Sequence, residues 1–313
     1  MGEGDRAPVA RRPDVADAVA FRCDGDAPWA MPRRTERQMT TREASTGAAE
    51  IEIRDVAVRF SSAAGEVTAL AECSLSVPAG SFTVVIGPNG CGKSTLLRLI
   101  AGLIEPSHGT VLVGGSQPRG GSERVGIAFQ QPRLLPWRSV VDNVGLPLEI
   151  DGLPEPMRRA RAAAALDRVG LGDVGGLRPR ELSGGMAQRA GLARALIGDP
   201  PVLLLDEPFS ALDALSRETF DVELQRLWLD RRRTIVLVTH SVSEAVMLAD
   251  RVVVMTPRPG RVAAVVEVEL PRPRPADLHG LAAATSPTAE IRQTLDDAHA
   301  AELRPWVEDG APG

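Results

Sequence analysis

Gly87-Pro88-Asn89-Gly90-Cys91-Gly92-Lys93-Ser94-Thr95 is the stretch of this sequence that decides the fold, because it fits the phosphate-binding pattern G-x-x-x-x-G-K-[ST] at every fixed position. The apolar run Phe82–Ile86 before it predicts a buried strand, and Leu96, Leu97 and Ile100 after it predict one apolar face of a helix. In such a strand–loop–helix unit, backbone N–H groups and the positive end of the helix face a phosphate. The stretch therefore predicts a phosphate site.

Two side chains of this loop have separate chemical roles. Lys93 is the one lysine among the 36 Lys and Arg residues of the chain. A compact ammonium fits between phosphates where the forked guanidinium of arginine does not. The Ser94 hydroxyl follows at the position that offers an oxygen to Mg²⁺.

Composition limits the class of protein. With 313 residues and 43% hydrophobic content, the chain can bury a real core in one large domain or two modest ones. The net charge of −5 and the absence of tyrosine disfavour a nucleic-acid binder. No apolar run approaches the roughly 18 residues of a spanning helix, and no signal peptide opens the chain. Any membrane role is therefore expected to be peripheral. The unpatterned Cys23, Cys73 and Cys91 separately favour a reducing cytosol.

The chain is expected to contain one folded domain with a tail at each end. Residues 1–49 mix small polar residues, prolines and charges of both signs, which predicts a disordered arm; Met31 and Met39 within it raise the hypothesis of a later start. Residues 50–270 are expected to form one α/β domain with a helical subdomain over about 140–195. Residues 271–313 are expected to be a tail that begins as a Pro-rich extended linker and has room for one helix over 289–303.

Apolar patterns predict two kinds of strand. Alternation over residues 51–60 and a short run over 74–77 predict half-covered strands, and further strands are expected at 110–113, 125–129 and 262–268. Fully apolar runs at 202–205, 234–238 and 251–255 alternate with helices, which predicts a parallel sheet that is covered on both faces.

The run from Val202 to Leu205 ends abruptly in Asp206-Glu207-Pro208. Burial of this strand places both acids at the carboxyl edge of the sheet, where open α/β sheets bind their ligands. Asp206 is then placed to hold Mg²⁺, and Glu207 to polarise an attacking water. The alternative is a solvated acidic pair in an ordinary turn.

A second anion site is predicted at Leu182-Ser183-Gly184-Gly185-Met186. Ser183 is a candidate N-cap for a helix that runs to Leu196, and the two glycines expose backbone N–H groups at its positive end. Without its context, Ser-Gly-Gly before a helix is only a capped turn.

With these motifs in this order, residues 51–268 resemble the ATP-binding subunit of an ABC transporter. The resemblance implies an α/β fold of the P-loop NTPase, ABC ATPase kind: a RecA-like mixed sheet core, an antiparallel β subdomain and a helical signature subdomain. It implies ATP and Mg²⁺ as cofactors, and ATP hydrolysis coupled to transmembrane transport. Met186 departs from the pattern, since the family usually has Gln at this position.

The resemblance also implies a role for each matched residue. The catalytic residues are Glu207, His240 and Gln130; the metal ligands are Ser94, Gln130 and Asp206; the nucleotide-binding residues are Phe60, Gly87, Pro88, Asn89, Gly90, Cys91, Gly92, Lys93, Ser94, Thr95, Ser183, Gly184 and Gly185. Ser210-Ala211-Leu212-Asp213 matches the loop that communicates across the dimer. Alternatives stay open for three residues: Phe60 as a strand end, His240 as a local cap, and Gln131 in place of Gln130.

Partners follow from the same resemblance. A second copy of the chain is expected in an ATP-sandwich dimer, with Ser183, Gly184 and Gly185 of one copy over the nucleotide of the other. The Pro-interrupted residues 130–139, with Leu134, Leu135 and Trp137 expected to be exposed, would dock a membrane permease, and a solute-binding protein would take part indirectly. Leu134-Leu135-Pro136-Trp137 and the stretch around residues 239–260 resemble the nitrate, sulfonate and taurine importer branch.

Three other classes compete with this interpretation. A chromosome-maintenance ATPase needs a long coiled coil between phosphate loop and signature, and residues 96–181 are too few and lack heptads. A soluble P-loop phosphotransferase needs neither signature nor dimer loop. An exporter subunit is disfavoured because no membrane domain is fused to the chain.

Overall fold

The computed structural model describes residues 47–62, 65–122, 124–209, 212–275 and 284–308. Its elements are β1 (Ile51–Ser62), β2 (Gly65–Val77), β3 (Phe82–Ile86), α1 (Lys93–Ile100), β4 (His108–Val113), β5 (Val125–Ala128), α2 (Val140–Val144), α3 (Leu146–Ile150), α4 (Glu155–Arg168), η2 (Gly172–Val174), η3 (Pro179–Glu181), α5 (Gly184–Leu196), β6 (Val202–Asp206), α6 (Ala214–Arg231), β7 (Thr234–Thr239), α7 (Val242–Leu248), β8 (Arg251–Met255), β9 (Val262–Glu267) and α8 (Thr285–Glu308). The chain divides into two compact units, Met1–Arg42 and Glu43–Gly313, and all described residues belong to the second. The predicted arm up to residue 46 and the hypothesis of a later start lie outside the described residues.

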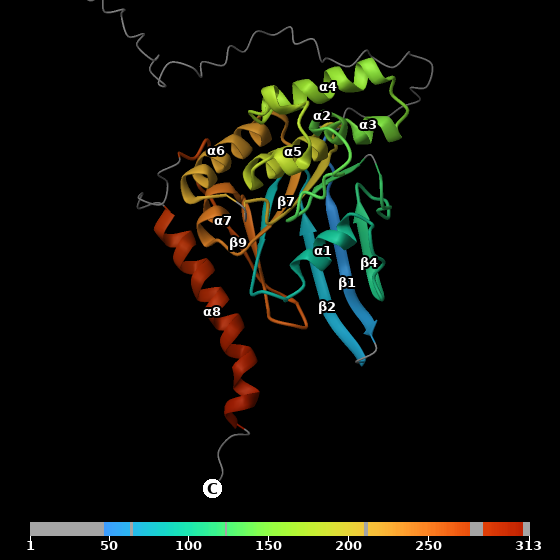
Figure 1. Ribbon diagram of the computed structural model, residues 1–313. Coiled ribbons are helices and arrows are strands. Elements are labelled where there is room, and N and C mark those ends of the chain that lie inside the picture. Colours follow the sequence, from blue (N-terminus) through green and yellow to red (C-terminus); the bar gives the residue numbers. More distant parts are fainter. Residues whose placement is uncertain (1–46, 63–64, 123, 210–211, 276–283, 309–313) are drawn as a thin grey trace, which may run out of the picture. The chain divides into compact units, whose positions relative to one another are not determined.

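Six strands form the central sheet in the order β5-β6-β7-β3-β8-β9 (Figure 1). The first five of these run parallel, and β9 pairs antiparallel with β8 at the edge. The predicted strands over 82–86 and 251–255 match β3 and β8 residue for residue, and β6 and β7 each continue one residue beyond the prediction. The predicted parallel sheet is therefore confirmed.

Consecutive side chains of the central strands enter opposite cores, as the period of two in a strand requires. In β3, Val84 lies in the core beneath α5, α6, α7 and α8, whereas Val85 lies in the core shared with α1 and the antiparallel sheet. Leu203 and Leu204 of β6 divide in the same way. Each such side chain contributes about 1.5–3 kcal/mol by burial. The sheet is thus covered on both faces and gives a rigid edge for a site.

A separate antiparallel sheet has the order β2-β1-β4. The strand predicted over 74–77 is only the end of β2, which begins at Gly65. The prediction of a short strand was wrong because buried and exposed residues alternate regularly only over the last five residues of β2, whereas residues 65–67 are exposed and Ala69 and Leu70 are both buried. These residues form a strand because they pair with β1, where Val67 lies opposite Phe60, and β1 supplies the partners for their backbone hydrogen bonds.

The chain between β5 and β6 is helical, as predicted for residues 140–195, and Figure 1 shows α2, α3 and α4 together beyond the ends of the strands. Of these helices, α2 and α4 share a small core with α5, which includes Val140, Leu166 and Ala190. Side-chain oxygens cap two of them: Ser139 Oγ accepts from Asp142 N at the start of α2, and Ser183 Oγ accepts from Met186 N at the start of α5.

The C-terminal region is fixed more firmly than the sequence predicted. Residues 271–275 were expected to be a linker, yet Arg274 is only 2% exposed and donates to the carbonyl oxygens of Val246 and Ala249 at the end of α7. Burial lowers the pKa of Arg274 to about 10. Beyond it α8 is longer than the predicted helix, and Ile291 anchors it in the main core.

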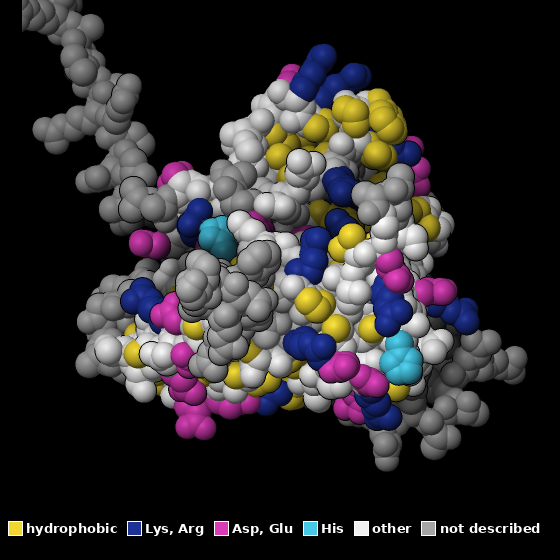
Figure 2. All heavy atoms as spheres, turned by 90° about the horizontal axis from the view of Figure 1, so that it is seen from below, with side chains coloured by type: hydrophobic (Ala, Val, Ile, Leu, Met, Phe, Trp, Pro, Cys, Tyr) yellow, Lys and Arg dark blue, Asp and Glu magenta, His cyan; other side chains and the backbone are white. Residues whose placement is uncertain are grey.

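The surface carries charges of both signs. On the face seen in Figure 2, Lys and Arg side chains are interspersed with Asp and Glu rather than gathered into one basic field. Of the helices in the described residues, none combines the length and the apolar character that crossing a bilayer requires.

Candidate functional site

Four neighbouring parallel strands deliver the predicted site residues to one edge of the sheet. The phosphate loop follows β3, His240 follows β7, Glu207 follows β6, and Gln130 comes two residues after β5. Because parallel strands end at the same edge, residues from four distant parts of the sequence meet there.

The phosphate loop is held from inside by its lysine. Lys93 Nζ donates to Gly87 O at 2.8 Å and to Pro88 O at 2.9 Å, and the side chain is almost buried. The β8–β9 turn supports the loop from outside, since a Cβ on Gly260 would lie 1.9 Å from Cys91 O. The loop is therefore a preformed cradle rather than a free turn.

The predicted metal ligands Ser94 and Asp206 are in direct contact, because Ser94 Oγ donates to Asp206 Oδ1 at 3.0 Å. Burial raises the pKa of Asp206, although the hydrogen bond from Ser94 opposes this effect. A buried carboxylate beside a hydroxyl is a pair of hard oxygen donors that a cation of Mg²⁺ type prefers.

Glu207 is the centre of a second group. Gln130 Nε2 donates to Glu207 Oε2 at 2.9 Å, and His240 Nδ1 lies 3.8 Å from Glu207 Oε1. Glu207 has a φ of 43°, which is the left-handed region that side chains other than glycine rarely adopt, while its N–H still donates to Val238 O at 3.0 Å. Backbone strain of this kind clusters at functional sites. Of the two adjacent glutamines, Gln130 is the one that contacts the carboxylate.

The predicted second anion site forms the start of α5. Ser183 is its N-cap, as predicted, and Gly184 and Gly185 form its first turn. Gly185 is packed closely, because a Cβ there would lie 2.6 Å from Leu212 Cδ2. Gln188, on the same helix, donates to Gln130 O and so ties this helix to the neighbourhood of Glu207. No pattern in the sequence had singled out Gln188.

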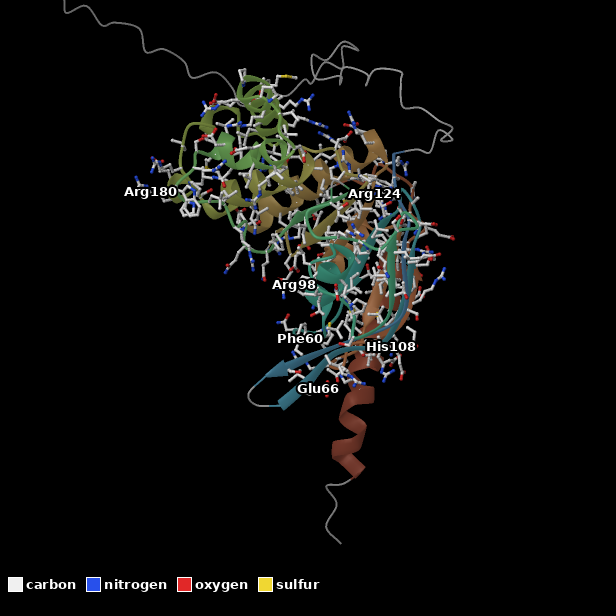
Figure 3. All side chains as sticks on the ribbon, turned by 90° about the vertical axis from the view of Figure 1, so that its right-hand side faces the viewer. Phe60, Glu66, Arg98, His108, Arg124 and Arg180 are labelled. Atoms are coloured by element: carbon white, nitrogen blue, oxygen red, sulfur yellow. The ribbon has the colours of Figure 1, made fainter. Side chains whose placement is uncertain are left out.

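Phe60 lies apart from these groups. Figure 3 shows it on the antiparallel sheet, well apart from Arg180 of η3. Its side chain is 43% exposed, so it is not a buried core residue.

A pocket of about 390 Å³ opens beside the phosphate loop, and its lining includes two residues that the sequence did not indicate. The lining residues are Ile86, Gly87, Pro88, Asn89, His240, Leu295 and Asp296. Leu295 and Asp296 belong to α8, almost 200 residues after the loop in sequence. Neither carries a motif, so only the fold reveals that α8 reaches this site.

Residues 130–139, predicted to dock a permease, expose one apolar side chain strongly. Trp137 is 67% exposed, but Leu134 packs against the helical core and Leu135 is half-buried, so the expectation that all three are exposed was wrong. Buried Asn143 shapes the segment, since its side chain bonds to the backbone of Leu135 and to Ser139 O. Of the predicted dimer loop, Ser210 and Ala211 lie outside the described residues.

A phosphate cradle, a hydroxyl–carboxylate pair and a strained glutamate at one edge of a parallel sheet define the class as a P-loop nucleoside triphosphatase. The ABC transporter family model matches residues 70–210. An uncharacterized ABC transporter ATP-binding protein of Methanocaldococcus jannaschii is 44% identical over 225 residues, which are 72% of this chain and 84% of that protein. An aliphatic sulfonates import ATP-binding protein of Burkholderia lata is 50% identical over 214 residues, 67% of this chain and 76% of its own length.

A solved structure agrees with these sequences. The dimeric, post-hydrolysis state of an ATP-binding cassette bound to ADP and Pi has a TM-score of 0.65 and 29% identity, and the match covers 70% of this chain and 99% of that one. The chain belongs to the ABC transporter family, as one of its ATP-binding and ATP-hydrolysing subunits. The interpretation as a soluble phosphotransferase is thereby excluded, and the fold predicted from the sequence is confirmed.

Proposed function

We propose that this chain powers an importer for an aliphatic sulfonate, taurine, nitrate or a related small solute, with aliphatic sulfonates as the class to test first. Relatives named as aliphatic sulfonates import ATP-binding proteins, from Burkholderia lata and Pseudomonas fluorescens, are 50% and 48% identical to it. The single observation that carries the hydrolytic half of the proposal is the group formed by Glu207, Gln130 and His240 at the edge of the sheet.

In this proposal Lys93 and the N–H groups of the phosphate loop bind the β- and γ-phosphates of ATP, and Phe60 stacks on the adenine. Glu207 accepts a proton from the attacking water, while Gln130 and His240 fix the position of that water. The bond from water oxygen to γ-phosphorus forms as the bond to the bridging oxygen breaks, which gives ADP and phosphate. The 2.9 Å bond from Gln130 supports this role, because it already orients the Glu207 carboxylate.

The donor set fits Mg²⁺. Ser94, Asp206 and Gln130 would hold the ion, and its charge would neutralise the phosphates. The described residues contain no group of three or more His, Cys, Asp or Glu side chains that could hold a metal ion. A Mg²⁺ ion typically takes only a few ligands from the protein and completes its coordination shell with phosphate and water oxygens.

The nucleotide site is proposed to be composite. Ser183, Gly184 and Gly185 of a second copy would cover the γ-phosphate held by Lys93, so that ATP joins two copies about a two-fold axis. The bare N–H groups at the start of α5 support this role, because they form a positive helix end. The related cassette of known structure is itself dimeric.

The coupling surface is proposed to be residues 130–139 at the cytoplasmic face of the membrane. Trp137 is an exposed aromatic anchor of the kind that dominates interfaces, and Ile150 nearby in sequence is 78% exposed. Gln130, at the start of this segment, touches Glu207, so a displaced permease helix would move the catalytic group directly. A periplasmic or extracellular solute-binding protein would act on the permease rather than on this chain.

One experiment tests both halves of the proposal. The chain is reconstituted in proteoliposomes with the permease encoded beside its gene, and phosphate release is measured with and without solute-loaded binding protein. We expect sulfonate-dependent hydrolysis that Lys93→Ala and Glu207→Gln abolish, and we expect Trp137→Glu to lose the stimulation while keeping basal hydrolysis. Hydrolysis that Glu207→Gln leaves intact would contradict the assigned chemistry, and failure of every sulfonate, taurine and nitrate to stimulate would contradict the solute class.

A further inference from the structure

A buried ionic cluster lies behind the proposed catalytic group, between α6 and α7. Arg217 Nε of α6 and Glu244 Oε1 of α7 are 3.5 Å apart, and the Glu244 side chain is only 6% exposed. Asp221, one turn further along α6, is also buried. Burial raises the pKa of both carboxyls, to about 8 for Asp221, and the charge of Arg217 opposes the rise.

Glu244 fixes the backbone on both sides of His240. Its Oε2 accepts a hydrogen bond from Thr239 Oγ1, the residue before His240. The same Thr239 oxygen accepts from Ser241 N at 3.0 Å, and Ser241 Oγ accepts from Glu244 N at 3.2 Å. The segment that presents His240 is thus a small ring of hydrogen bonds closed by one buried carboxylate.

Arg217 contacts the backbone at two residues that follow Glu207 and Pro208. Its Nη2 lies 3.5 Å from Phe209 O and 3.3 Å from Leu212 O, and Leu212 N donates to Phe209 O at 3.0 Å. The Phe209 ring also packs edge-on against Phe220 of α6, with centroids 5.1 Å apart. The Leu212 side chain lies against Gly185 at the start of α5.

We propose that Arg217 and Glu244 form a positioning pair that fixes the backbone on either side of Glu207, namely the His240 segment on one side and the carbonyl groups of Phe209 and Leu212 on the other. The inference rests on the proposed roles of Glu207 and His240. Neither member of the pair touches the predicted nucleotide residues directly, so the pair acts through the two segments. An intact buried ion pair is often no more stabilising than apolar packing, whereas removing one of its partners destabilises the fold, so the test separates turnover from stability.

The test compares turnover with binding in three variants. Glu244→Gln keeps an oxygen to accept from Thr239 but removes the charge that faces Arg217. Arg217→Met removes the guanidinium group. Arg217→Lys keeps the positive charge, but a single ammonium cannot reach both the Glu244 carboxylate and the two carbonyl oxygens. Asp199→Asn is the control, because it removes the carboxylate that pairs with Arg231 and with partly buried Arg233, just before the start of β6 and therefore at the opposite end of the strand from the proposed chemistry.

We expect kcat to fall about tenfold or more in Glu244→Gln and Arg217→Met, as misplaced catalytic groups require, while the KM for Mg-ATP changes less than about threefold. The double variant should be no slower than the slower single one, since both changes break one link. Asp199→Asn should lower the unfolding temperature and leave kcat unchanged. If Arg217→Met does not fold, Arg217→Lys takes its place, and its kcat should lie between those of Glu244→Gln and the wild type.

Two results would overturn the pair's role. One is a wild-type kcat in Glu244→Gln and Arg217→Lys; the other is a multiplicative loss in the double variant, which would show independent effects. Failure of the proposed function is distinguishable, because in that case Glu207→Gln and His240→Ala would themselves leave wild-type hydrolysis unchanged.

Discussion

The turn between β8 and β9 should control nucleotide binding, although none of its residues was predicted to bind the nucleotide. Gly260 N donates to Ala69 O at 3.0 Å and Gly260 O accepts from Ala71 N at 3.0 Å, so two backbone hydrogen bonds fix this residue against β2. Its φ lies outside the left-handed region, so Gly260→Ala introduces no backbone strain of its own. The added Cβ would lie 1.9 Å from the carbonyl oxygen of Cys91, inside the phosphate loop.

The size of the effect follows from this distance. Ordinary contact begins at 3.4 Å, so the two atoms must separate by about 1.5 Å. A backbone carbonyl cannot rotate away as a side chain can, and Gly260 is held by β2. The phosphate loop around Cys91 must therefore be displaced. Overpacking of this kind costs about 1–3 kcal/mol of stability. A displacement of about 1 Å at a catalytic constellation costs on the order of 100-fold in rate.

The assay measures thermal unfolding, Mg-ATP affinity and phosphate release for Gly260→Ala beside Gly176→Ala. Gly176 is the matched control, because nothing lies within 4 Å of a Cβ there. We expect Gly260→Ala to lose kcat/KM about 100-fold with a moderate loss of stability, and the control to behave as wild type. Wild-type affinity and turnover in Gly260→Ala would refute the view that this turn supports the phosphate loop.

Three further predictions concern single side chains. Phe60→Ala should weaken Mg-ATP binding about 5- to 100-fold, the value of one base–aromatic stack, with Phe60→Trp near wild type; an equal loss in Leu103→Ala, another exposed apolar residue, would contradict adenine stacking. Asp296→Asn should tighten Mg-ATP binding about twofold, because a carboxylate in the pocket opposes the triphosphate, whereas Asp297→Asn outside it should have no effect. Burial raises the pKa of Asp221 to about 8, so the native state binds the extra proton and the unfolding free energy falls as pH rises from about 4 to about 8. Asp221→Asn should flatten that fall in thermal melts, and an unchanged slope would contradict it.

The sequence predicted the parts of the fold that local chemistry determines. The phosphate loop, the strand Phe82–Ile86 and the helix beginning at Gly184 are marked by residues that few other structures tolerate, and the structure places them as predicted. Asp206 and Glu207 were expected at the sheet edge because the fully apolar run that precedes them must be buried. Their catalytic and metal-binding roles stay predictions.

Other features depend on contacts between segments that are distant in sequence. The outer half of β2 exists because β1 pairs with it, and Arg274 is buried because the end of α7 offers it carbonyl oxygens. Leu134 is covered by helices whose packing no local pattern reveals. The contribution of Asp296 to the pocket and the link between Arg217 and Glu244 are of the same kind, since both join elements that only the tertiary structure brings together.

The composite site is the central claim, and the oligomeric state of Glu207→Gln tests it most directly. This variant keeps the phosphate loop and the start of α5 but lacks the base, so bound ATP should persist. Light scattering during size-exclusion chromatography should show a monomer without nucleotide and a dimer with Mg-ATP, and adding Lys93→Ala should restore the monomer. A monomer that has demonstrably bound Mg-ATP would contradict the proposal that Ser183, Gly184 and Gly185 of one copy close over the nucleotide of the other.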